Sequence, residues 1–470
     1  MSIDLVIKNG TVAAPGGAQK TDVAVEGAKI LAVGNASCFP EAKKVIDATD
    51  KIVIPGGIDT HSHFEIHFMG VKSPENWDTA TIASAIGGTT TTVDFALQQK
   101  GKTLLDGIKS QFERAEKLSA IDYTTRPLIT DLDDLEKVVD GIEECIDFGV
   151  TGFKGATIYR KPGWYENDWQ LYRIMKRVTE VGGLWSAHVE NCLIGEEMQT
   201  WLISQGKTDP KYHGVAKPNF VENMDIQKLC ILAEELGTYV YVVHTTTREG
   251  PGIIQSFRDR GVAAFCETCT HYLWLTDATF EPKLPRGIMY MCSPPLRKQE
   301  DIEALWDGLK SGTVQTVGSD HCGFPMSQKQ EYSARFNEIP NGFPGCECRV
   351  PIVYQEGVTK RGMTLEKFVD VTSTNAAKIF GMYPRKGVIA PGSDADIVVF
   401  DPNKKHSLNA AALHMGTDLS VFEGMEVTGW PTATILRGKV IVENEKFLGT
   451  RGEGQFIKAK LNPKVMADGV

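Results

Sequence analysis

The sequence lacks any run of about eighteen apolar residues, the length that a membrane-spanning helix requires. Its first twenty residues also lack the basic stretch, apolar core and small-residue cleavage site of a secretory signal. Cysteine is scarce, with 10 residues among 470, so we expect reduced thiols rather than a disulfide framework. These absences favour a cytoplasmic protein without a membrane anchor.

An excess of positive charge is also missing. The formal net charge is −10, which excludes strong electrostatic attraction to nucleic acid or to an anionic membrane. Hydrophobic residues make up 42% of the chain and charged residues 23%, as in a globular protein. At 470 residues, the chain can hold a barrel of about 250 residues and a second, smaller domain. Small neutral molecules remain open as substrates.

Short strand patterns occupy both ends of the chain. Near the start they are Leu5–Lys8, Val23–Val25 and Lys29–Val33, separated by glycine and asparagine turn signals. The same pattern of short strands recurs at Asp396–Asp401 and Thr432–Val442. We therefore expect one small β-sandwich domain made from residues 1–54 and 383–470 together.

Between these ends, residues 55–382 alternate apolar strands with amphipathic helices. The strand segments are Val53–Ile58, Thr89–Phe95, Ile121–Ile129, Val150–Gly155, Leu184–Val189, Tyr239–Val243, Ala263–Cys266 and Val314–Gly318. Helical patterns include Leu104–Leu118, Leu132–Phe148, Trp169–Val181 and Asp225–Leu236. The alternation predicts an α/β fold with an eight-stranded parallel (β/α)8, TIM-like barrel. A doubly wound parallel sheet is the alternative architecture.

The pair His61 and His63 directly follows an apolar strand pattern. Two imidazoles two residues apart on a strand project to the same side, so both can reach one cation. Other polar side chains end later strands of the predicted barrel: Lys154, His188, His244 and Asp320. Alone, each histidine reads as a hydrogen-bonded core residue and Asp320 as a helix cap. Their joint position at one mouth of the barrel favours a metal site.

Lys154 is the unusual member of this set. A cationic ammonium beside divalent metals would be repelled and costly to bury. An amine whose pKa is lowered by burial can instead add carbon dioxide, which gives an anionic carbamate with two oxygens able to bridge two cations. Without the histidines, the simpler interpretation is a salt-bridged lysine in the barrel.

Several strings in the chain resemble the dihydropyrimidinase and D-hydantoinase family of cyclic amidohydrolases, and the resemblance extends almost from end to end. They are Gly56–His63, Ala187–Asn191, Val242–His244, Ser293–Arg297, Gly318–Cys322, Ile339–Gly342, Thr372–Phe380, Tyr383–Gly387, Gly392–Asp396 and Val421–Met425. The resemblance implies a zinc hydrolase of pyrimidine degradation. Such an enzyme opens dihydropyrimidines or 5-substituted hydantoins at the cyclic C–N bond and releases N-carbamoyl amino acids.

The resemblance also implies a role for each site residue. His61, His63, Asp320 and carboxylated Lys154 (N6-carboxylysine) would hold one zinc, and Lys154, His188 and His244 a second, with a bridging hydroxide between them. Asp320 would also carry a proton to the departing ring nitrogen. Tyr159 would stabilise the carbonyl oxygen, with a packing role as its alternative, and Ser293 and Asn341 would grip the ureide edge of the ring.

Two segments depart from the family pattern. Small residues such as Ala156 follow Lys154, and His67 stands where a proline is common, so we expect a smaller, more polar substrate pocket; a surface position for His67 is an equal alternative. Arg126 stands where a histidine is usual, and His271 within Glu267–Tyr272 resembles allantoinases and dihydroorotases, which form the second enzyme hypothesis.

A hypothesis of another class is a non-catalytic scaffold, because relatives of this family have become scaffolds after losing metal ligands. A scaffold would bind no metal, whereas the full ligand set is present here. The resemblance further implies a homotetramer, and the segment from Gln455 onward, including Phe456 and Ile457, is a candidate for subunit contacts.

Overall fold

The computed structural model describes residues 3–14, 17–281 and 286–468. Its largest sheet has eight parallel strands that follow chain order without a reversal. They are β8 (Gly57–Ser62), β11 (Thr89–Leu97), β12 (Asp122–Leu128), β13 (Gly152–Ala156), β14 (Leu184–His188), β15 (Tyr239–Val242), β16 (Ala264–Cys269) and β17 (Thr316–Gly318). A parallel bridge between Ser62 and His321 returns the last strand to the first. The predicted TIM-like barrel is confirmed, and the doubly wound sheet, which would reverse its strand order, is wrong.

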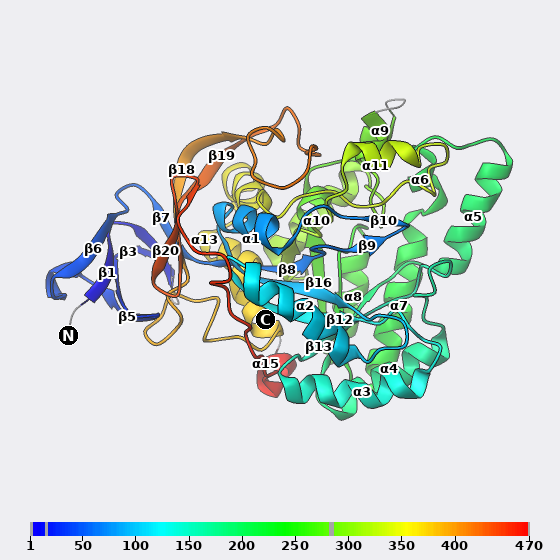
Figure 1. Cartoon of the computed structure of the whole chain (residues 1–470), viewed down its shortest axis with the longest axis horizontal. Helices are drawn as coiled ribbons and strands as arrows, with labels where there is room; N and C mark the ends of the chain where they lie inside the picture. The colour runs from blue at the N-terminus through cyan, green and yellow to red at the C-terminus, as the bar shows by residue number, and fades with distance from the viewer. Residues whose placement is uncertain (1–2, 15–16, 282–285, 469–470) are drawn as a thin grey trace.

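Helices surround this barrel (Figure 1). They include α1 (Trp77–Ile86), α2 (Leu104–Leu118), α3 (Leu135–Phe148), α4 (Asp168–Glu180), α5 (Cys192–Ser204), α6 (Tyr212–Ala216), α7 (Asn219–Leu236), α8 (Gly250–Arg258), α9 (Arg286–Met289), α10 (Gln299–Ser311), α11 (Met326–Glu331), α12 (Arg349–Val353), α13 (Leu365–Val369), α14 (Asn375–Ile379) and α15 (Pro463–Asp468). Helix α4 shows the pattern: Leu171, Ile174, Met175 and Val178 form its buried stripe. Among the described residues, no helix has both the length and the apolar character needed to cross a bilayer.

The first barrel strand differs from the prediction. The apolar run Val53–Ile58 is divided between two sheets, because β7 (Ile52–Pro55) belongs to the small domain and β8 begins at Gly57. At Gly56 the chain passes so close to Thr90 that a Cβ would lie 2.0 Å from its Oγ1. A side chain does not fit there, and an apolar run alone cannot reveal that the chain changes sheets.

Strands from both ends of the chain form the small domain. One sheet contains β1 (Ile3–Lys8), β4 (Asp22–Glu26), β5 (Lys29–Gly34) and β6 (Ala42–Asp47). The other contains β2 (Thr11–Ala14), β3 (Gly17–Lys20), β7, β18 (Ile397–Ser407), β19 (Glu426–Leu436), β20 (Lys439–Glu443) and β21 (Lys446–Phe447). Residues from both sheets, such as Leu5, Val25, Val53 and Ile397, share one buried cluster. The exact limits of this domain, 1–54 and 383–470, stay a prediction.

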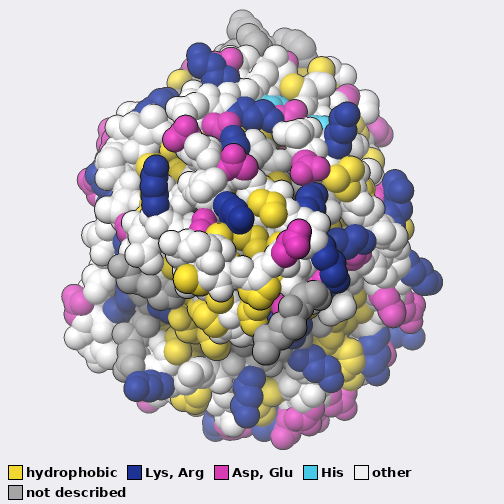
Figure 2. Space-filling model, turned by 90° about the vertical axis from the view of Figure 1, so that its left-hand side faces the viewer, with side chains coloured by type: hydrophobic (Ala, Val, Ile, Leu, Met, Phe, Trp, Pro, Cys, Tyr) yellow, Lys and Arg dark blue, Asp and Glu magenta, His cyan; other side chains and the backbone are white. Residues whose placement is uncertain are grey.

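The face of this domain that Figure 2 shows carries positive and negative side chains side by side, and neither sign forms a continuous field.

On the barrel, the segment around Phe456 packs against its own chain. Phe456 contacts the rings of Phe112 and Phe148, Ile457 is fully buried, and its N–H donates to the carbonyl of Tyr123 over 2.8 Å. Ile457 is therefore covered by its own barrel and is not free for a subunit contact, whereas a contact through the half-buried Phe456 stays a prediction.

A buried ion cluster joins the C-terminal part of the chain to the amino end of β12. The ammonium of Lys386 lies 2.5 Å from Asp122 Oδ2 and 3.1 Å from Asp394 Oδ2, and it also contacts Asp396. These carboxylates expose at most 5% of their side chains. Burial alone would lower the pKa of Lys386, but the three carboxylates raise it above its usual value. The lysine therefore carries a full charge that compensates the acidic cluster.

Replacing Lys386 by methionine is expected to destabilise the protein by about 3–5 kcal/mol, because three buried carboxylates would lose the cation that they share. Arg437 would still pair with Asp122, and Arg385 and Lys29 with Asp394, but no cation other than Lys386 contacts all three carboxylates among the described residues. The free energy of unfolding from urea titration measures this loss. Lys176→Met, which removes an exposed lysine on α4, should change it by less than about 0.5 kcal/mol. Equal stability of the two variants would show that the cluster contributes nothing.

Candidate functional site

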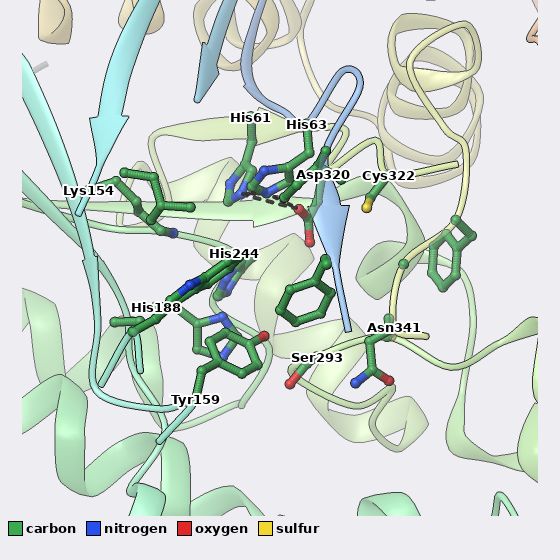
Figure 3. Close-up of a pocket in the computed structure, with 18 of the residues that line it drawn as sticks. His61, His63, Lys154, Tyr159, His188, His244, Ser293, Asp320, Cys322 and Asn341 are labelled. Atoms are coloured by element: carbon green, nitrogen blue, oxygen red, sulfur yellow. Dashed lines mark hydrogen bonds and ion pairs between the residues drawn. The ribbon is translucent and has the colours of Figure 1, made fainter. Parts of the chain in front are cut away.

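A pocket opens at the carboxyl ends of the barrel strands. It is lined by all nine residues proposed from the sequence: His61, His63, Lys154, Tyr159, His188, His244, Ser293, Asp320 and Asn341 (Figure 3). Three of these residues lie within the barrel strands β8, β13 and β14, and the other six lie in segments that follow barrel strands. The structure thus places every predicted site residue at one pocket, while the chemical role of each remains a proposal.

His61, His63 and Asp320 form one compact group. The Nε2 atoms of the two histidines lie 3.2 Å apart, and Asp320 Oδ1 lies 3.2 Å from that of His61 and 3.3 Å from that of His63. Burial lowers the pKa of His63 to about 4, so its imidazole is neutral and has a lone pair to share. Three ligand-type atoms close enough to bind one ion therefore face the pocket.

Glu267, for which no role was predicted from the sequence, holds this group in place. Its Oε1 lies 2.6 Å from Nδ1 of His61 and accepts a hydrogen bond from the N–H of His244. Its Oε2 accepts from the hydroxyls of Thr60 and Tyr241. Bonding Nδ1 of His61 leaves Nε2 directed at the pocket. The signal in the sequence was a single charged residue within the buried strand β16.

Lys154, His188 and His244 form the opposite side of the site (Figure 3). The rings of His188 and His244 are 4.4 Å apart between centroids. The ammonium nitrogen of Lys154 is buried and has no hydrogen-bond partner among the residues that the structure describes. Burial and the charge of Arg126 lower the pKa of Lys154 to about 7. A large fraction of this lysine is therefore neutral at physiological pH.

Three site residues have strained backbones. Tyr159, His244 and Asp320 have φ values of 74°, 36° and 48°, in the left-handed region that residues with a Cβ seldom adopt. Such conformations persist only where the surrounding structure enforces them, and they concentrate at functional sites. In this chain they direct three side chains into the same pocket.

The donor set fits a metal centre. Four imidazoles and a carboxylate are ligands that divalent transition metals prefer. The buried Nζ of Lys154 and Nδ1 of His244 lack partners within the described part of the chain, although unpaired buried polar atoms are costly. A bound ion and a carboxylated Lys154 would give these two nitrogen atoms the partners that they lack. The residues therefore fit a metal-dependent site.

The rest of the pocket has a more apolar wall than the sequence predicted. Ile66, Phe68 and Trp164 line it together with Ala156, whereas His67 is exposed on the short hairpin β9 (His67–Phe68) and β10 (Val71–Lys72). The expectation of a more polar pocket is therefore wrong, and the surface alternative for His67 is correct. His271, also a pocket residue, is buried, and burial lowers its pKa to about 4.

A TIM-like barrel with histidine, aspartate and lysine side chains at its strand ends is the arrangement of metal-dependent barrel hydrolases. The model of the Amidohydrolase family matches residues 52–441. The D-hydantoinase of Geobacillus stearothermophilus is 38% identical over 466 residues, 98% of each chain. A solved D-hydantoinase structure superposes with a TM-score of 0.94 at 37% identity, over 98% of this chain and 99% of that one. The dihydropyrimidinase of Brevibacillus agri gives 0.93 at 37%, over 97% and 98%.

The chain therefore belongs to the amidohydrolase family, among the D-hydantoinases and dihydropyrimidinases. The resemblance inferred from the sequence is confirmed, and with it the class of enzyme, a cyclic amidohydrolase. The scaffold hypothesis does not apply to a chain that is an enzyme.

Proposed function

We propose that this enzyme opens the cyclic C–N bond of dihydropyrimidines or 5-substituted hydantoins and releases N-carbamoyl amino acids. The observation that carries the proposal is the convergence of four histidines, Lys154 and Asp320 on a pocket that also contains Tyr159. The relatives named above support these substrates over the alternative of an allantoinase or dihydroorotase.

Two zinc ions are the proposed cofactors. His61, His63, Asp320 and Lys154 would hold one ion, and Lys154, His188 and His244 the other. Lys154 would act as N6-carboxylysine, since its buried and unpartnered amine is available to carbon dioxide. When bound, two such ions lower the pKa of a shared water and supply the nucleophile that amide hydrolysis needs.

Asp320 is the proposed proton carrier. It lies beside His61 and His63, and its left-handed backbone directs the carboxylate into the pocket. There it would accept the proton of the attacking water and deliver it to the ring nitrogen as the C–N bond breaks. Ser293 and Asn341 would orient the ureide edge of the ring, and the apolar wall would receive its substituent.

Tyr159 is the proposed donor to the carbonyl oxygen. Burial raises the pKa of its hydroxyl well above 10, so it remains protonated and able to donate. Tyr159→Phe is expected to retain both metals and to lower kcat about a hundredfold or more, as for loss of an oxyanion donor. Tyr165→Phe, which removes a hydroxyl from the same loop outside the pocket lining, should keep wild-type kcat. Unchanged kcat in Tyr159→Phe would remove this tyrosine from the chemistry.

Turnover by the zinc-loaded protein, prepared with bicarbonate, tests the proposed function. Dihydrouracil, a 5-aryl hydantoin, allantoin and dihydroorotate would be compared by loss of ring-amide absorbance. The proposal requires opening of one of the first two, and the apolar wall favours the aryl hydantoin. Turnover confined to allantoin or dihydroorotate would establish the alternative enzyme, and no turnover with two bound metals would contradict both.

A homotetramer in the cytoplasm is the proposed state of the protein. Exposed apolar side chains on neighbouring helices support self-association, among them Trp169 on α4, Trp201 on α5 and Ile231 on α7. All ten cysteines are free thiols, which supports a reducing compartment. Light scattering of the purified protein would test the assembly.

A further inference from the structure

Resting on the proposed function, we propose that Lys217 is a positioning residue that fixes Ser293 at the substrate-binding edge of the pocket. It acts through direct contact with Ser293 and with Glu190. Lys217 does not line the pocket. It lies in the connection between α6 and α7, and no motif in the sequence marked it as a functional residue.

One oxygen of Glu190 is the centre of a buried network. Its Oε2 lies 2.9 Å from the ammonium of Lys217, and the Ser293 hydroxyl donates to it over 2.9 Å. Nε2 of His188 lies 2.8 Å from the same oxygen. Lys217 also donates to Ser293 Oγ over 2.6 Å. A substrate-edge residue and a proposed metal ligand therefore share one carboxylate, whose charge is balanced by Lys217.

Burial makes this network costly to disturb. The side chains of Glu190 and Lys217 expose 0% and 3% of their surface. Without Lys217, Glu190 would be a buried carboxylate with no cation, and Ser293 would lose the donor to its Oγ. The Ser293 hydroxyl is bound by both Lys217 and Glu190. Loss of the lysine removes one of these contacts, so we expect the Ser293 segment to shift in response.

The backbone around Lys217 is itself fixed. The Arg297 guanidinium donates to the carbonyl of Lys217 and, over 3.0 Å, to Glu222. His213, on α6, lies with its Nε2 2.7 Å from the carbonyl of Cys292, the residue before Ser293. The α6–α7 segment therefore contacts residues 292–293 through the side chains of His213 and Lys217. Of these two side chains, Lys217 is the charged one.

The network also determines what Ser293 offers to a substrate. Its single hydroxyl proton is donated to Glu190, and its oxygen accepts from Lys217. Under the proposed function, the backbone N–H and C=O of Ser293 would be the groups that meet the ureide edge. Small displacements of this backbone would change substrate binding more than the chemical step, so the effect of losing Lys217 should appear mainly in KM.

Three variants test the inference: Lys217→Met, Lys217→Arg and the double variant Glu190→Gln/Lys217→Met. The double variant removes both charges, so it should fold even where the single methionine variant does not. Lys211→Met, an exposed lysine six residues upstream, is the matched control. Zinc content, the midpoint of thermal unfolding, and kcat and KM on the preferred cyclic ureide would be measured for each.

We expect both methionine variants to raise KM about tenfold or more with two zinc ions retained, and Lys217→Arg and Lys211→Met to stay within about threefold of wild type. An unchanged KM in the double variant would overturn the inference. Loss of zinc with unchanged KM would do so too, because Lys217 would then act through His188.

A crystal structure of the double variant gives a result independent of turnover. We expect the backbone of residues 292–294 to move from its position in the wild-type protein; an unmoved segment would overturn the inference. If the wild-type protein opens no cyclic ureide, the proposed function fails, yet this structure still decides whether Lys217 positions Ser293.

Discussion

Lys154→Ala is expected to abolish both binding of two metals and turnover. The variant removes the buried amine of the pocket, and with it the carbamate proposed to join both ions. Four histidines and Asp320 would then face each other without a shared anionic ligand. Zinc content by elemental analysis should fall below two per chain, and kcat should become undetectable.

Chemical rescue makes this prediction specific. A short carboxylic acid such as propionate can enter the space left by Lys154 and supply two oxygens, so it should restore part of the activity of the alanine variant. Lys161→Ala, at an exposed lysine in the following loop, should behave as wild type with or without the acid. Full activity of Lys154→Ala without any added acid would rule out a bridging carbamate.

Asp320→Asn is expected to fold normally and to lose turnover by about a hundredfold to ten-thousandfold, the range of general acid–base catalysis. The amide keeps the size of the carboxylate and its contacts with His61 and His63, but it cannot take up a proton. Steady-state kinetics and thermal unfolding of the same preparation would separate the two effects.

Asp140→Asn, which changes an exposed carboxylate on α3, serves as the control and should retain wild-type turnover. Zinc content must be measured alongside, because Asp320 is also a proposed ligand. An Asp320→Asn variant with zinc bound and near-normal kcat would show that another group carries the proton.

Much of the site was predictable because parallel strands in a barrel present their carboxyl ends at one rim. His188 and His244 could be assigned to a common pocket from their places alone, since His188 ends β14 and His244 follows β15. Glu267 and Lys217 could not, since their partners are brought to them only by tertiary packing. A charged residue inside a strand or a helix connection has many structural roles, and sequence spacing does not choose among them.

The pocket wall shows how a shift of one residue misleads. Adjacent residues in a strand face opposite sides, so in β9 the burial of Phe68 places His67 outside. Similarly, Val53–Ile58 reads as one strand because its apolar residues are nearly continuous, although the structure divides it between β7 and β8. Their separation depends on a close approach between Gly56 and Thr90, which is a property of the folded chain.

The sheet that combines β7 with β18 has a consequence for biosynthesis. Pro55 pairs with Ile397, 342 positions later, so the early strands of this sheet leave the ribosome long before their partner exists. Every barrel strand, from β8 to β17, is made in the interval. The strands near the amino terminus can pair with one another, but the edge of β7 that later binds β18 stays open while the barrel assembles, so we expect this edge to be exposed to aggregation and chaperone binding at that stage of synthesis.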